Sequence, residues 1–165
     1  MRALLQRVSR ASVQVEGATV ASIQSGLLLF VGVGHDDDEP TAVALARRVT
    51  ELRIFRDDEG RTNRSMLEVG GSALVVSQFT LYADTSRGRR PGFTDAADPA
   101  LAERLYLRFA EGLRDAGVAD VQTGSFGAEM AVELVNDGPF TIWLDTRDRT
   151  RGPERDREDP WTHSC

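Results

Sequence analysis

The feature that most constrains the fold is a short, continuous apolar run bordered by glycines, Leu27-Leu28-Leu29-Phe30-Val31-Gly32-Val33. A strand with one face in water alternates apolar and polar residues, whereas a strand covered on both faces is apolar throughout. Since this run does not alternate, we predict a strand at the centre of a sheet, buried on both faces.

Two segments show the start signals and the apolar spacing of helices. The acidic run 36–39 and Pro40 suit a first helical turn, which favours this assignment over a metal site for the three aspartates. Asp98-Pro99 repeats the signal, and Gly117 supplies a stop. Apolar residues recur at spacings of three and four in both segments: Ala42, Leu45, Ala46, Val49 and Leu52, then Leu101, Leu105, Phe109 and Leu113.

Further strands are predicted where short segments rich in β-branched residues lie between turn signals. These are residues 3–8, 12–16, 19–23, 73–82, 131–137 and 140–145. The fold class is therefore α/β, a single β-rich domain with a mixed sheet and two main helices. We expect this domain to span residues 1–146. Residues 147–165 are charged and nearly free of apolar side chains, so we predict a disordered tail.

Composition limits the classes of function. The 165 residues contain no run of about 18 apolar residues and no signal peptide, so we expect a cytoplasmic protein without membrane contact. The net charge of −6 argues against a protein that coats nucleic acid. A local basic patch at Arg87, Arg89 and Arg90 could still contact phosphates, and a solvated loop is an equally good interpretation.

The sequence lacks the residues of the common hydrolytic sites. Its two histidines, His35 and His163, have no triad setting, and neither HExxH nor CxxC spacing is present. The single cysteine, Cys165, cannot form a metal cluster alone. We therefore predict no metal and no cofactor, and catalysis would use backbone groups, hydroxyls, amides or the substrate.

Two polar segments stand where a plain core strand would not place them. In residues 77–81, alternation along a strand would put Gln78 and Thr80 on one face, which also suits ordinary cross-strand hydrogen bonding. In residues 136–141, Asn136-Asp137-Gly138-Pro139 has the composition of an ordinary turn. Pattern alone favours the structural interpretation for both segments.

Together the two segments resemble the paired signatures of the D-aminoacyl-tRNA deacylase family, SQFTL at residues 77–81 and NxGPxT at residues 136–141. Residues 6–13, 53–55, 88–91 and 126–130 also resemble that family. The likeness extends from residue 1 to about residue 145, and both signatures are complete.

The resemblance implies an intimate homodimer with its active site at the subunit interface. Backbone N–H groups around Phe79 and Thr80 would stabilise the oxyanion of the ester, and a cis Gly138-Pro139 dipeptide would come from the other chain. The remaining implied residues are Ser77, Gln78 and Met130 for substrate binding, Asn136 and Thr141 for support of the motif, and Arg87, Arg89 and Arg90 for tRNA.

The implied activity is hydrolysis of D-aminoacyl-tRNA with rejection of the L form. If the Gly138 and Pro139 carbonyls hold the substrate amino group, a D side chain points outward and an L side chain meets backbone. Glycine would escape this filter, so glycyl-tRNA would also be cleaved. The ribose 2′-hydroxyl would replace a histidine base, with a Thr80 nucleophile as the alternative mechanism. A non-catalytic nucleic-acid-binding homodimer of the same fold is the alternative function.

Overall fold

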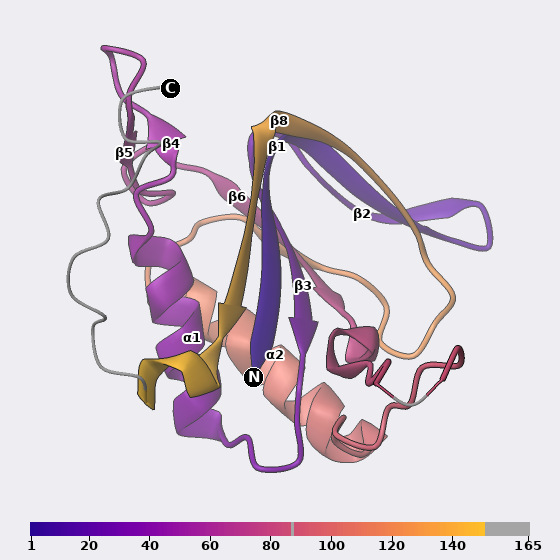
Figure 1. Cartoon of the computed structure of the whole chain (residues 1–165). Coiled ribbons are helices and arrows are strands. Elements are labelled where there is room, and N and C mark those ends of the chain that lie inside the picture. Colours follow the sequence, from indigo (N-terminus) through magenta and orange to yellow (C-terminus); the bar gives the residue numbers. More distant parts are fainter. Residues whose placement is uncertain (87, 151–165) are drawn as a thin grey trace.

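The apolar run forms β3 (Gly26–Gly32) at the centre of a mixed sheet, as predicted (Figure 1). The computed structural model of the chain describes residues 1–86 and 88–150. β3 pairs antiparallel with β1 and parallel with β6. The strand order is β2-β1-β3-β6-β7 with β8 added to β1, where the other strands are β1 (Arg2–Val15), β2 (Ala18–Ile23), β6 (Ser72–Ser77), β7 (Val121–Thr123) and β8 (Ala131–Asp145).

Both faces of β3 are packed. Leu27 and Leu29 point into a cluster formed with α1 (Glu39–Glu51) and α2 (Pro99–Asp115). Leu28 points the other way, into a second cluster with residues of β1, β2 and β6. All three leucines have no exposed surface. The sheet therefore separates two apolar layers, which explains the absence of alternation in this run.

The two helices start where the sequence predicts. The Asp38 carboxylate accepts the backbone N–H of Thr41 at 2.8 Å, and the Asp98 carboxylate accepts that of Leu101 at 3.1 Å. Each aspartate thus satisfies a donor that the first helical turn leaves free. Gly117 follows α2 with φ of 105°, a conformation that glycine adopts readily.

The long strands β1 and β8 correct the predicted boundaries. Segments 3–8 and 12–16 fall in the two halves of β1, except that Glu16 lies in the turn after it, and segments 131–137 and 140–145 are the two halves of β8. The pairing of the two strands is irregular between Gln6 and Val8 and again between Val8 and Arg10. Such irregularities let a strand turn without ending, so both strands bend together (Figure 1). The short hairpin of β4 (Phe55–Arg56) and β5 (Thr62–Arg64), and β7, were not predicted.

The end of the chain lies partly beyond the described residues. β8 leads into the 3₁₀ helix η2 (Thr146–Thr150), and the rest of the predicted tail, with Arg87, lies outside the described part. No helix among residues 1–86 and 88–150 is long and apolar enough to cross a membrane. The same residues contain no group of three or more His, Cys, Asp or Glu that could hold a metal ion. The boundary at residue 146 stays a prediction.

Tyr106 fastens α2 to β6, and we expect Tyr106→Phe to lower the free energy of unfolding by about 1 kcal/mol. Its buried hydroxyl donates to the Val75 carbonyl at 2.9 Å. Burial raises the pKa of Tyr106 from 10.0 to about 12. The contribution should therefore be constant below pH 10 and disappear as pH rises through 12. Denaturant unfolding at pH 7 and above pH 10 measures it, and equal stability of both proteins at pH 7 would contradict this assignment.

Candidate functional site

The SQFTL segment leaves the sheet at its second residue. β6 ends at Ser77, and residues 79–82 form the 3₁₀ helix η1 (Phe79–Tyr82), so the predicted strand over residues 73–82 is wrong at its end. The Gln78 N–H makes the last bond to β3, at 2.8 Å from the Val31 carbonyl oxygen. A Cβ at Gly32 would lie 3.0 Å from the Gln78 carbonyl oxygen, so glycine there lets the chain turn closely over β3.

This turn leaves two backbone donors free. The N–H groups of Phe79 and Thr80 start η1 and have no acceptor in the described part of the chain, as is usual for a first helical turn. The side-chain amide of Gln78 donates to the Thr80 hydroxyl at 2.5 Å. The amide and the hydroxyl are therefore neighbours, although across a turn rather than on one face of a strand.

A cavity of about 570 Å³ lies beside η1. Ser77, Gln78 and Phe79 line one part of it, and Met130 lines another while packing against the second core cluster. Phe93 meets Phe79 edge to face, with ring centroids 4.9 Å apart. The Phe79 side chain is 55% exposed despite this contact. The cavity is thus mainly apolar, with an aromatic pair at one side and free N–H donors on the adjoining turn.

The NxGPxT segment forms the bend of β8. The Gly138-Pro139 bond is cis, as the resemblance implies, and both residues are exposed. The side-chain amide of Asn136 closes the bend because it accepts the Phe140 N–H at 2.6 Å and donates to the Phe140 carbonyl at 3.2 Å. Asn136 also donates to the Thr141 hydroxyl at 3.2 Å. Asn136 and Thr141 therefore hold a loop that presents the dipeptide outward.

Arg7 supports the same bend and was not predicted as a site residue. Its side chain is 3% exposed, and its Nε donates to the Asp137 carbonyl at 2.9 Å. Its Nη1 donates to the Ile54 carbonyl at 2.5 Å, and its guanidinium lies 4.8 Å from the centroid of the Phe140 ring. The sequence carried a signal, since Arg7 follows the buried positions Ala3 and Leu5 in strand alternation.

Within one chain the two signatures do not meet. Asn136 pairs with Val8, Val8 with Gly26, and Gly26 with Ser72 at the start of β6. Ser77 stands five residues further, which is roughly 16 Å along a strand. The dipeptide thus lies at the opposite end of the sheet from η1.

Arg89 and Arg90 are exposed in the loop between η1 and α2.

Comparison with known proteins decides the family. The family model described as D-Tyr-tRNA(Tyr) deacylase matches residues 4–145. This chain belongs to the D-aminoacyl-tRNA deacylase family. It is 61% identical over 152 residues to the D-aminoacyl-tRNA deacylase of Thermomicrobium roseum, covering 92% of this chain and 98% of that protein. The D-aminoacyl-tRNA deacylase of Dinoroseobacter shibae is 61% identical over 145 residues, covering 88% and 99%.

Two solved structures are similar to this chain in fold. The c-Myc DNA Unwinding Element Binding Protein matches with a TM-score of 0.84 and 36% identity, over 88% of this chain and 99% of that chain. A probable eukaryotic D-amino acid tRNA deacylase matches with a TM-score of 0.76 over 87% of this chain and 97% of that chain. At 19% identity the second likeness shows the fold alone.

Proposed function

We propose that this deacylase hydrolyses the ester bond of D-aminoacyl-tRNA and releases the free D-amino acid and tRNA. The observation that carries the proposal is the structural setting of the two signatures, residues 77–81 and 136–141. One borders a cavity and offers two free N–H donors, and the other presents an exposed dipeptide held by Asn136 and Arg7. This reaction needs N–H donors that stabilise the oxyanion. It also needs a rigid group that distinguishes the D from the L configuration of the substrate.

The active site is completed in a homodimer. A single chain keeps Gly138 and Pro139 at the other end of the sheet from η1, so in this proposal the dipeptide of one subunit serves the cavity of its partner. Exposed apolar side chains favour such an interface, since Val135 is 38% and Trp143 45% exposed on β8. The dimer therefore has two identical composite sites, as a two-fold axis requires.

The aminoacylated end of tRNA occupies the cavity beside η1. Its apolar and aromatic lining suits the terminal base and sugar, with Ser77, Gln78 and Met130 as binding residues. The ester carbonyl oxygen then lies at the Phe79 and Thr80 N–H groups, which stabilise the developing negative charge. The ribose 2′-hydroxyl of the substrate assists the attack of water. Arg89 and Arg90 are proposed to contact phosphates, as is Arg87 outside the described residues.

Handedness is judged at the substrate Cα. A pocket that accepts many side chains cannot separate mirror images by contacts with those side chains. Backbone carbonyls of Gly138 and Pro139 that hold the amino group leave room for a D side chain and oppose an L side chain. Glycyl-tRNA has no side chain to exclude and is also cleaved.

The direct test follows ester loss from D-tyrosyl-tRNA and L-tyrosyl-tRNA with purified protein. The proposal expects rapid loss of the D ester and survival of the L ester, with glycyl-tRNA cleaved as well. Equal cleavage of both tyrosyl esters, or cleavage of neither, would refute it.

The Thr80 hydroxyl should be dispensable. In the described part of the chain its only hydrogen-bond partner is the Gln78 amide, and neither a carboxylate nor an imidazole is bonded to it as a base. We expect Thr80→Ala to keep activity within about threefold, whereas a terminal 2′-deoxyadenosine should abolish cleavage. Single-turnover deacylation measures both. If Thr80→Ala were inactive and the wild-type protein still cleaved the 2′-deoxy substrate, the result would instead indicate a threonine nucleophile.

A second candidate is a nucleic-acid-binding homodimer without catalysis. It is favoured by the likeness to a protein named for binding a DNA element, and Arg89 and Arg90 would provide its contacts. The net charge of −6 and the two complete signatures count against it. DNA binding by a protein that cleaves no aminoacyl ester would select this function instead.

The cytoplasmic location inferred from the sequence stays a prediction.

A further inference from the structure

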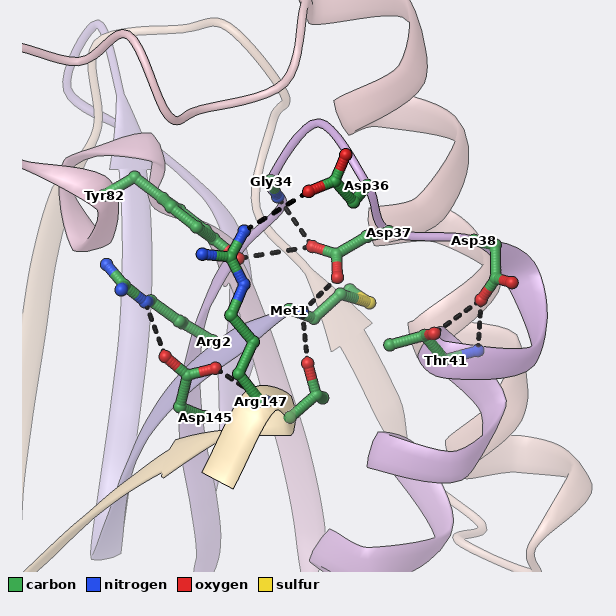
Figure 2. A network of polar contacts seen from close by, with 11 residues as sticks. Met1, Arg2, Gly34, Asp36, Asp37, Asp38, Thr41, Tyr82, Asp145 and Arg147 are labelled. Carbon is green, nitrogen blue, oxygen red and sulfur yellow. Dashed lines mark hydrogen bonds and ion pairs between the residues drawn. The ribbon is translucent and has the colours of Figure 1, made fainter. Parts of the chain in front are cut away.

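Arg2 of β1 lies beside Tyr82 of η1 and is bonded to Asp145 (Figure 2), and it does not line the cavity. The Arg2 Nη1 donates to the Leu81 carbonyl at 2.9 Å, and Nε donates to the Asp145 carboxylate at 2.9 Å. The guanidinium also lies over two rings, 4.4 Å from the centroid of Tyr82 and 5.8 Å from that of Trp143. A single side chain thus joins the end of η1 to β1 and β8.

A second support reaches η1 through Tyr82. This side chain is 2% exposed, and its hydroxyl donates to Asp37 at 3.2 Å (Figure 2). Asp37 also accepts the Gly34 N–H at 2.6 Å and the Met1 ammonium group. A Cβ on Gly34 would lie 2.9 Å from the Tyr82 ring, so the ring rests directly on the backbone. Burial, followed by the Asp37 charge, raises the pKa of Tyr82, so its hydroxyl remains a donor.

η1 is too short to fix its own position. A 3₁₀ helix of four residues has few internal hydrogen bonds, and its last carbonyls have no partner within the helix. Arg2 satisfies one of those carbonyls, at Leu81, two residues beyond the first free donor. A shift of Leu81 would turn the N–H groups of Phe79 and Thr80 away from the reacting carbonyl.

We propose that Arg2 is a positioning residue for the oxyanion donors of η1. This inference rests on the proposed deacylase function and names a residue outside both signatures. The planar guanidinium bonds a carbonyl and a carboxylate while stacking on Tyr82, and a lysine ammonium cannot reproduce this combination. Arg2 acts through η1 and touches no substrate.

The test compares Arg2→Met and Arg2→Lys with Arg108→Met. Arg108 is a matched control, because it is 28% exposed beside two carboxylates and Arg2 is 25% exposed beside one. Because small misplacements of catalytic groups are costly, we expect Arg2→Met to lower kcat about tenfold with KM within about twofold. The kcat of Arg2→Lys should lie between those of Arg2→Met and the wild type, and the kcat of Arg108→Met should equal that of the wild type. The ratio of D-ester cleavage to L-ester cleavage should not change, since Gly138 and Pro139, which are proposed to reject the L form, lie in another loop.

Hydrogen exchange separates this inference from the proposed function. The hydrogen-bonded amides of Leu81 and Ala83, at η1 and its C-terminal end, should exchange faster in Arg2→Met, while those of β3 keep wild-type protection. A wild-type kcat in Arg2→Met, an equal loss in Arg108→Met, or unchanged exchange in η1 would each overturn the positioning role. A wild-type protein that cleaves no D-aminoacyl-tRNA would instead refute the proposed function. Hydrogen exchange in Arg2→Met and the wild type would then still test whether Arg2 stabilises η1.

Discussion

Gly138→Ala should lower kcat/KM for D-aminoacyl-tRNA by at least about 100-fold. An alanine Cβ at this position would lie 2.5 Å from the Phe140 nitrogen and 3.0 Å from the Phe140 Cβ. Asn136 clamps that nitrogen at 2.6 Å, so the strain cannot be relieved by a small move of Phe140. The loop must shift, and the carbonyls proposed to hold the substrate amino group shift with it. Deacylation at subsaturating substrate measures the loss.

Gly17→Ala is the control for this substitution. Gly17 has φ of 80°, which alanine tolerates poorly, but no atom lies within 4 Å of its added Cβ. We expect this variant to lose some stability and to keep its activity. Full activity of Gly138→Ala, or an equal loss in Gly17→Ala, would show that the bend of β8 has no special part in the reaction.

Phe79→Pro should lower kcat by about 100-fold to 1,000-fold, the usual effect of losing one oxyanion donor. Proline removes the Phe79 N–H and is tolerated at the first position of a helix. The preceding residue, Gln78, has φ of −144° and ψ of 84°, which lies outside the helical region that proline disfavours before it. The turn should therefore survive while the donor is lost. Single-turnover kinetics at saturating protein isolate the chemical step.

Phe79→Ala separates the ring from the donor, since it keeps the N–H and removes the contact with Phe93. It should weaken substrate binding and leave kcat much closer to the wild type. If Phe79→Pro were no slower than Phe79→Ala, the oxyanion would have to be stabilised elsewhere.

Periodicity and end signals were sufficient for the parts of the fold that local sequence determines. The run at residues 27–33 and the caps at Asp38 and Asp98 predicted β3 and both helices, because burial and capping act within a few residues. The bends of β1 and β8 were mistaken for strand ends. A bend shared by two paired strands depends on their register, which neither segment contains alone.

The candidate site divides in the same way. Its two signatures could be recognised from residue order, whereas the turn of residues 79–82 out of the sheet could not. That turn depends on Gly32 and Arg2, which come from strands distant in the sequence. Arg7 was missed for a similar reason, since its partners Ile54 and Asp137 meet it only in the fold.

The most direct test mixes two inactive chains, one with Gly138→Ala and one with Phe79→Pro, under conditions that let subunits exchange. Each variant alone should form an inactive homodimer. If the dipeptide serves the partner subunit, half of the exchanged dimers are mixed and each contains one intact site. Cleavage of D-aminoacyl-tRNA should then recover to about one quarter of the wild-type rate. No recovery in a mixture shown to contain mixed dimers would contradict the claim that handedness is read across the interface.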